Sequence, residues 1–176
     1  MNPSVTFKDT ISPGLRAAAA SIKNKKPILQ AMGQVLVSIT QGAFNMPNLR
    51  IAPWAPVKKT SGAPLKSRAP VLWRSIRVVE LTNSQVTVGT DRPYAPYHQF
   101  GTKPYTIRPK SKKALAWPGG AHPVKRVDHP GLPARPFFPF SPSGHLAPFA
   151  LRQIEAAAQA KIASLLSKDV TPGPGK

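Results

Sequence analysis

Proline is the residue type that most constrains how this chain can fold. The sequence holds 22 prolines against 12 glycines in 176 residues. Because proline has no amide hydrogen and a fixed φ, it is poorly tolerated inside helices and central strands. We therefore expect much of the chain to form extended loops. Long loops are uncommon in compact domains and are often functional, so the proline content favours a protein that packs against partners in an assembly.

Two stretches carry helical periodicity instead. The first spans residues 14–44 and is broken at Pro27, which suits a first helical turn. The second spans residues 147–166, with Ser143 in the N-cap region and Pro148 in the first turn. In both, apolar residues recur at three- and four-residue steps. They are Ile28, Met32, Val35, Leu36, Ile39 and Ala43 in the first stretch, and Leu151, Ile154, Ala158, Ile162 and Leu165 in the second.

Strand patterns lie between the two helical stretches. Residues 76–81 and 85–89 are rich in β-branched side chains and flank Asn83-Ser84, which predicts a hairpin. A helical turn is expected just before it, at residues 71–75. Further short strands are expected at residues 105–108, 115–117 and 124–127, and residues 5–8 are expected to form a short strand or an ordered arm.

These elements predict one α+β domain over residues 1–170. It has a long N-terminal helix, a small antiparallel β-sheet with extended Pro-rich loops, and a C-terminal helix. The extended basic loops are residues 45–70 and 103–135, and residues 171–176 are expected to be a flexible tail. Trp54 is the large apolar residue of the first loop, and we expect it to pin that loop to the core, with an interface role as the alternative.

Positive charge is the second unusual property of the sequence. The chain has 25 Lys and Arg residues but only six Asp and Glu residues, for a formal net charge of +19. Residues 50–135 carry +13 of this charge, so the charge belongs mainly to the connecting loops. Such a field repels other copies of the chain and attracts nucleic acid, an acidic protein face or anionic lipid.

No residue pattern indicates a catalytic or cofactor site. The six acids are scattered singly, so we expect no enzymatic activity and assign no catalytic residue. The absence of cysteine excludes disulfides, thiolate metal sites and a cysteine nucleophile. His122 and His129 flank Asp128, but this spacing in a Pro-rich loop fits no standard zinc pattern. Gly119-Gly120 indicates a turn and not a phosphate loop. We therefore predict no metal and no cofactor.

The sequence also predicts where the protein is made. No apolar run follows Met1, so we expect no signal peptide. The apolar stretches fall far short of the roughly 20 residues that span a bilayer, so no membrane partner is expected. These features predict a soluble protein made inside the cell.

Two basic clusters are candidates for contact with DNA phosphates or with an acidic partner. In order of preference they comprise Arg108, Lys110, Lys112 and Lys113, and then Lys58, Lys59, Lys66 and Arg68. Aromatic residues do not interleave with them as a single-strand platform would require, and no helix-turn-helix, zinc-finger or RNA-binding motif is visible. The clusters therefore predict non-specific contact with duplex DNA and no recognition of base sequence.

Two further stretches are the most distinctive in the chain. Residues 91–102 read Asp-Arg-Pro-Tyr-Ala-Pro-Tyr-His-Gln-Phe-Gly-Thr, and residues 129–138 read His-Pro-Gly-Leu-Pro-Ala-Arg-Pro-Phe-Phe. With Trp54, they supply the candidate residues for a subunit interface or motif. These are Tyr94, Tyr97, His98, Phe100, Gly101, Arg135, Phe137 and Phe138.

Residue chemistry gives each distinctive stretch an expected role. We expect Tyr94, Tyr97 and Phe100 to bury a turn against the sheet. Gly101 allows a chain reversal that a side chain would prevent. Arg135 can bind several carbonyl groups or a carboxylate through its planar fork. A contact with another subunit is the alternative for the aromatic residues and for Arg135.

In their order and spacing, these stretches resemble the virion morphogenesis proteins of tailed bacteriophages, the tail-completion or neck proteins of Mu-like and lambdoid siphophages. In that family a Tyr-Ala-x-x-His/Glu-x-Gly-Thr-like segment follows a hairpin. A basic strand-loop-strand, Pro-Ala-Arg-Pro-Phe and a closing helix come next. Tyr94-Ala95 with residues 98–102 fits the first motif, and residues 133–137 fit the second. The resemblance covers roughly residues 32–166 and includes Trp54; the prolines of the first loop and the high charge depart from it.

The resemblance implies a structural virion protein at the head–tail junction, assembled in the host cytoplasm. It implies a homo-oligomeric ring, with six-fold symmetry, around a channel for double-stranded DNA. The expected neighbours are other neck proteins: a head-completion or connector ring and a tail-terminator or tail-tube ring. The alternatives are a non-specific nucleic-acid-binding protein and a minor capsid or head decoration protein. A virion nuclease would need clustered acids or histidines, which the sequence lacks.

Overall fold

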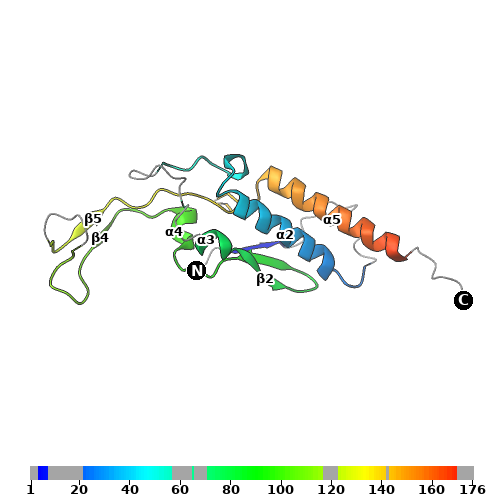
Figure 1. The fold of residues 1–176 in the computed structure, drawn as a ribbon, viewed down its shortest axis with the longest axis horizontal. Helices are drawn as coiled ribbons and strands as arrows, with labels where there is room; N and C mark the ends of the chain where they lie inside the picture. Colours follow the sequence, from blue (N-terminus) through cyan, green and yellow to red (C-terminus); the bar gives the residue numbers. More distant parts are fainter. Residues whose placement is uncertain are drawn as a thin grey trace, which may run out of the picture.

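The computed structural model describes residues 4–7, 22–56, 65, 71–116, 123–141 and 143–169. Helices and strands alternate along the chain, and their labels follow Figure 1. In chain order they are β1 (Ser4–Phe7), α2 (Lys26–Gly42), the 3₁₀ helix η1 (Pro47–Leu49), α3 (Val71–Arg74), β2 (Arg77–Leu81), β3 (Val86–Gly89), α4 (Ala95–Phe100), β4 (Tyr105–Ile107), β5 (Val127–His129) and α5 (Pro148–Asp169). This arrangement confirms the α+β class.

Helix α2 forms the centre of the body. It begins at Lys26 with Pro27 in its first turn, as predicted, because proline there sacrifices no helical hydrogen bond. Its predicted apolar residues are buried apart from Val35, which is half-buried. The expected helix over residues 14–25 is not found at residues 22–25, and residues 14–21 lie outside the described part of the chain.

The main sheet has the strand order β1-β3-β2, and both pairings are antiparallel. The β2–β3 pair is the predicted hairpin, and its turn closes with a hydrogen bond from the Thr82 amide to the Gln85 carbonyl. A register shift between Val78 and Glu80 interrupts the regular pairing of β2. The strand expected at residues 5–8 is β1 at Ser4–Phe7, with residue 8 outside the described residues, and it pairs with β3 across about 80 residues of sequence.

The body has three layers, with the main sheet on one side of α2 and α5 on the other (Figure 1). Helix α5 turns its small and branched residues toward α2, which lets the two helices pack closely. The residues of α5 that are buried in this contact are Ala150, Ile154, Ala158 and Ile162. Ser143 does not cap α5, because it lies in a tight turn where its hydroxyl bonds Ser141 and His145.

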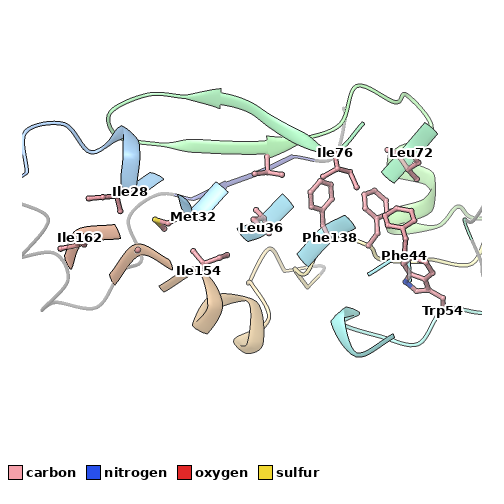
Figure 2. Close-up of a cluster of buried hydrophobic side chains, with 14 residues drawn as sticks. Ile28, Met32, Leu36, Phe44, Trp54, Leu72, Ile76, Phe138, Ile154 and Ile162 are labelled. Atoms are coloured by element: carbon pink, nitrogen blue, oxygen red, sulfur yellow. The ribbon is translucent and has the colours of Figure 1, made fainter. Parts of the chain in front are cut away.

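One continuous core fills the body, and its composition changes along its length (Figure 2). Ile28, Met32 and Ile162 form its aliphatic end, between α2 and α5. Aromatic residues fill the other end, where ring centroids of Phe44 and Trp54 lie 5.6 Å apart in an edge-to-face arrangement. The aromatic end is where the long loops join the body, so it fixes the position of the segments that extend outward. Among the described residues, no helix has the length and apolar character needed to cross a membrane.

Candidate functional site: a basic arm and the helix at its base

Residues 101–116 and 123–134 form an arm that projects away from the three-layered body (Figure 1). Strands β4 and β5 pair antiparallel along it, with Thr106 opposite Asp128. Farther out, a single bridge joins Leu115 and Val124. The sequence predicted strands here, but it placed one at residues 124–127, whereas β5 is Val127–His129. Of the strand predicted at residues 115–117, Leu115 makes this bridge and residue 117 lies outside the described residues. The seven residues 108–114 loop out between the two paired regions.

The base of the arm is closed by a short set of backbone contacts. The Thr102 amide donates to the Leu132 carbonyl at 2.9 Å, and the Leu132 amide donates to the Thr102 hydroxyl at 2.9 Å. Gly101 and Gly131 both have positive φ there, +73° and +88°. A Cβ on Gly101 would lie 2.7 Å from the Leu132 carbonyl oxygen, and one on Gly131 would lie 2.3 Å from that of Thr102. The two strands therefore approach each other only because both positions are glycine, which confirms the predicted role of Gly101.

The far part of the arm is strongly positive. The first predicted basic cluster lies on the loop over residues 108–114, and all of its side chains are exposed. Lys125 and Arg126 add two further exposed charges on the opposite strand. These six basic residues are Arg108, Lys110, Lys112, Lys113, Lys125 and Arg126.

Asp128 is the single acid of the arm, and it is already engaged. It accepts a hydrogen bond from the Thr106 hydroxyl at 2.6 Å and pairs with Arg126 at 2.9 Å. These contacts, with the Thr106 bond as the larger cause, lower the pKa of Asp128. Its carboxylate therefore braces the two strands and leaves the outer charges of the arm uncompensated.

Arg135 anchors the arm to the body. Its side chain is buried and donates through Nε to the Ala55 carbonyl at 3.1 Å and through Nη2 to the Pro56 carbonyl at 3.5 Å. This confirms the prediction that its planar fork binds carbonyl groups. The same contacts hold the end of the first Pro-rich loop against the segment that returns from the arm.

Trp54 lies in the same anchor and is buried in the aromatic end of the core (Figure 2). Its indole N–H donates to the Pro136 carbonyl at 2.9 Å, and the Arg50 guanidinium lies 4.0 Å from its ring centroid. These contacts confirm that Trp54 pins the loop to the core. Phe137 and Phe138 are fully buried beside it, so all three residues shape the fold.

Helix α4 lies where the arm leaves the body (Figure 1). Its inner face is made by Ala95 and Gln99, both buried. The Gln99 Oε1 accepts hydrogen bonds from the amides of Phe137 and Phe138, each at 3.0 Å. Sequence reasoning missed Gln99, because a single glutamine in a short segment has no distinguishing pattern. A buried glutamine beside a Pro-Phe-Phe stretch is recognisable only after folding.

The outer face of α4 corrects one prediction. Tyr94, Tyr97 and Phe100 were expected to bury a turn against the sheet, but their exposed fractions are 38%, 55% and 56%. The reason is helical spacing. Residues 94, 97 and 100 share one side of the short helix, and the side opposite them carries the buried residues. We call Tyr94, Tyr97 and Phe100 the α4 aromatic face.

His98 lies between the two faces of α4. It is half-buried, its ring packs edge-on against Tyr94, and its carbonyl accepts a hydrogen bond from the Arg135 amide at 2.7 Å. Burial, and next the positive charge of Arg135, lower the pKa of His98. The lowered pKa favours the neutral imidazole near pH 7, so α4 contributes little charge to the arm.

The other predicted residues are less informative. The second basic cluster, Lys58, Lys59, Lys66 and Arg68, lies outside the described residues, as does His122. His129 stacks on Tyr105, with ring centroids 5.0 Å apart, and its Nδ1 accepts from the Gly131 amide at 3.0 Å. Within the described segments, no three or more His, Cys, Asp or Glu side chains gather in a way that could hold a metal ion.

Comparison with known proteins identifies the chain. A model of the phage virion morphogenesis family matches residues 8–147. The chain belongs to this family. The match includes α2, the β2–β3 hairpin, α4 and the whole arm. It begins earlier than the resemblance seen in the sequence and ends just before α5. No curated protein and no solved structure matches the chain.

Family membership gives the site its context. The virion morphogenesis protein has a role in phage structure and assembly. Both distinctive stretches, residues 91–102 and 129–138, fall within the match, and they meet at the base of the arm. The groups exposed there are suited to binding another molecule. They are the aromatic rings at α4 and the basic side chains along the arm.

Proposed function

We propose that this virion morphogenesis protein forms a ring at the head–tail junction, joins head to tail and surrounds the channel through which DNA passes. The ring is a closed homo-oligomer, with six-fold symmetry as our specific expectation. Its neighbours are other neck proteins, on the head side and on the tail side. The protein acts by structure and not by catalysis.

The observation that carries the proposal is the arm, in a chain of this family. Two short strand pairings and a stacked Tyr105–His129 pair hold it together, and the basic side chains described in its far part are exposed. An extended segment of this kind gains stability when a neighbouring molecule covers it. In a ring, the arm of every copy can contact the next copy or an adjoining layer. Closed rotational symmetry lets every copy make the same contact.

The charge of the arm indicates what it approaches. Residues 101–134 carry seven basic residues and one acid. A strand advances about 3.3 Å per residue, so Arg108 lies up to about 20 Å beyond the Thr102 bridge. The charge is thus held well away from the body, where it can meet DNA phosphates in a channel or an acidic face of an adjoining ring.

A structural role also agrees with the ion pairs that Asp91 and Asp128 make. Asp91 pairs with Arg77 at 3.2 Å and with Arg92 at 3.0 Å, and Asp128 pairs with Arg126. The hydrogen bond from Arg77 lowers the pKa of Asp91, which makes it an unsuitable general base near neutral pH.

Deletion of the gene from the phage tests the proposal. The expected result is filled heads and separate tails in the lysate, seen by electron microscopy, and restoration of infectious particles when purified protein is mixed with that lysate. Closed rings of the purified protein, and rings at the neck of wild-type virions, are expected in the same images. Normal infectious particles from the deletion mutant would exclude the proposed role. Copy numbers far above those of one ring would indicate a decoration protein instead.

Non-specific DNA binding is the second candidate function, because the basic side chains of the loop over residues 108–114 are exposed. The test replaces three lysines of this loop with glutamine and measures duplex DNA affinity against salt. Each lost phosphate contact reduces the magnitude of the slope of the logarithm of the binding constant against the logarithm of salt concentration by about 0.9. The slope of the triple variant should therefore be smaller in magnitude by up to about 2.7. A control variant replaces three exposed lysines at the start of α2 and should keep the wild-type slope. The test set is Lys110, Lys112 and Lys113, and the control set is Lys23, Lys25 and Lys26.

The two candidates separate by the state in which DNA is bound. A monomer that binds duplex DNA tightly and forms no ring would favour the binding protein. Rings that bind DNA weakly, with equal slopes for the test and control variants, would mean that the arm contacts protein and not phosphate.

A further inference from the structure

The α4 aromatic face is a large apolar feature that the fold does not use. Tyr97 and Phe100 lie on a helix of only six residues, and Tyr94 is its N-cap residue. The helix is held to the body through its buried residues Ala95 and Gln99 and through the bond from the Arg135 amide to the His98 carbonyl. The Phe100 ring has its centroid 6.3 Å from that of Phe140, yet Phe100 is 56% exposed. Exposed aromatic clusters are typical of interaction sites, because Tyr and Phe supply much of the binding energy in protein interfaces.

Basic residues flank the α4 aromatic face in the chain. Arg92 precedes it and Lys103 follows it, and Asp91, next to Arg92, also pairs with Arg77 of β2. The carboxylate of Asp91 is shared between Arg77 and Arg92, so it neutralises only part of their charge. An apolar centre with a positive rim matches a partner that has an apolar centre and an acidic rim.

A second copy of this chain does not supply such a rim. The chain has six acids against 25 basic residues, and two of the acids, Asp91 and Asp128, are already held in ion pairs within the same molecule. Two copies that met through the α4 aromatic face would therefore bring flanking charges of the same sign together. Duplex DNA is also a poor match for the three aromatic side chains. Aromatic platforms bind unpaired bases, whereas the bases of duplex DNA are stacked inside the double helix.

We propose that the α4 aromatic face, together with Tyr105 at the start of the arm, is the docking surface for a different protein with an acidic surface. This inference rests on the proposed function, which places a layer of other neck proteins beside the ring. Tyr105 is 47% exposed and lies on β4, on the far side of Gly101 from α4. A partner seated on α4 therefore also meets the root of the arm, and the basic arm can extend along its acidic surface.

Gln99 makes this docking surface rigid. Its buried side chain joins α4 to Phe137 and Phe138, which directly follow the anchor residue Arg135. The aromatic rings and the base of the arm are therefore held in one ordered unit before the partner binds. Binding does not have to order a loop of this protein, which reduces its entropic cost.

The test uses heads and tails isolated separately from a lysate of phage that lacks this gene. Purified wild-type protein, a Tyr97→Ser/Phe100→Ser variant and a Met46→Ser control are each incubated with one kind of particle and centrifuged through a gradient. Met46 is a suitable control because it is 50% exposed but lies before η1, on another part of the body. Circular dichroism and thermal unfolding check that all three proteins are equally folded.

The expected result is that wild-type and control proteins sediment with one kind of particle. The double variant should bind at least about tenfold more weakly, since two central aromatic residues are removed. Wild-type binding should also weaken as salt rises, because the partner surface is acidic. Equal binding by the double variant, or binding that salt does not affect, would overturn the proposal.

Four further results would also overturn it, each in a recognisable way. Loss of ring formation by the folded double variant would assign the surface to a second copy of the chain. A loss of duplex DNA affinity would assign it to nucleic acid. If wild-type protein binds neither particle but restores infectivity to the mixed lysate, the docking proposal fails while the proposed function stands. If it does neither, both fail.

Discussion

The hydrogen bonds of Gln99 lead to a stability prediction that can be worked through in detail. Gln99→Met keeps the length and approximate volume of the side chain but removes the oxygen that accepts from the amides of Phe137 and Phe138. Both amides belong to fully buried residues, so water cannot replace the lost acceptor without disrupting the core.

The expected cost follows from the number of groups left without a partner. An unsatisfied buried backbone amide costs about 1–3 kcal/mol, so two of them should lower the free energy of unfolding by about 2–6 kcal/mol. The third contact, from Nε2 to the Phe138 carbonyl at 3.5 Å, is long and adds little. A loss of this size is a large part of the roughly 5–15 kcal/mol that stabilises a typical domain.

Urea denaturation of the purified protein measures this cost, with Gln153→Met as the matched control. Gln153 is exposed on α5, and a surface substitution of this kind changes stability by less than about 0.5 kcal/mol. Hydrogen exchange should be faster at the amides of Phe137 and Phe138 in the Gln99 variant. A loss below about 1 kcal/mol, with unchanged exchange at these two amides, would refute the view that Gln99 joins α4 to the base of the arm.

Two other predictions concern the arm base and the histidine beside it. Gly131→Ala should lower the thermal unfolding temperature more than Gly144→Ala. Both glycines have positive φ, so both substitutions strain the backbone. Only at Gly131 would the added Cβ also clash, because it would lie 2.3 Å from the Thr102 carbonyl oxygen, whereas nothing lies within 4 Å of a Cβ on Gly144. Equal losses of thermal stability in the two variants would show that the base of the arm can shift to accommodate the added Cβ. The pKa of His98 is lowered in the folded state, so the unfolded state binds more protons below the ordinary pKa of about 6.5, and stability should fall as pH drops through that value. His98→Gln should remove this decline and the exposed His145→Gln should not; an unchanged decline in the His98 variant would contradict the assignment.

The sequence determined the parts of the fold that depend on local periodicity. The apolar spacing in residues 28–43 and 151–165 predicted α2 and α5, because a helix places residues three and four apart on one face. The β-branched runs around Asn83-Ser84 predicted the β2–β3 hairpin for the same kind of reason, since its two strands are neighbours in the chain. The order of the motifs around Tyr94 and Arg135 was also enough to indicate the family.

Tertiary structure decided the features that join distant residues. The pairing of β1 with β3, the pairing of β4 with β5, and the buried bonds of Gln99 all connect positions whose separation no periodic pattern encodes. The side of α4 that faces the core was decided in the same way. Helical spacing groups Tyr94, Tyr97 and Phe100 on one face, but only the packing of Gln99 against Phe137 and Phe138 determines that this face points outward. The prolines predicted that the middle of the chain is extended, and the fold shows that part of this extended chain is an arm.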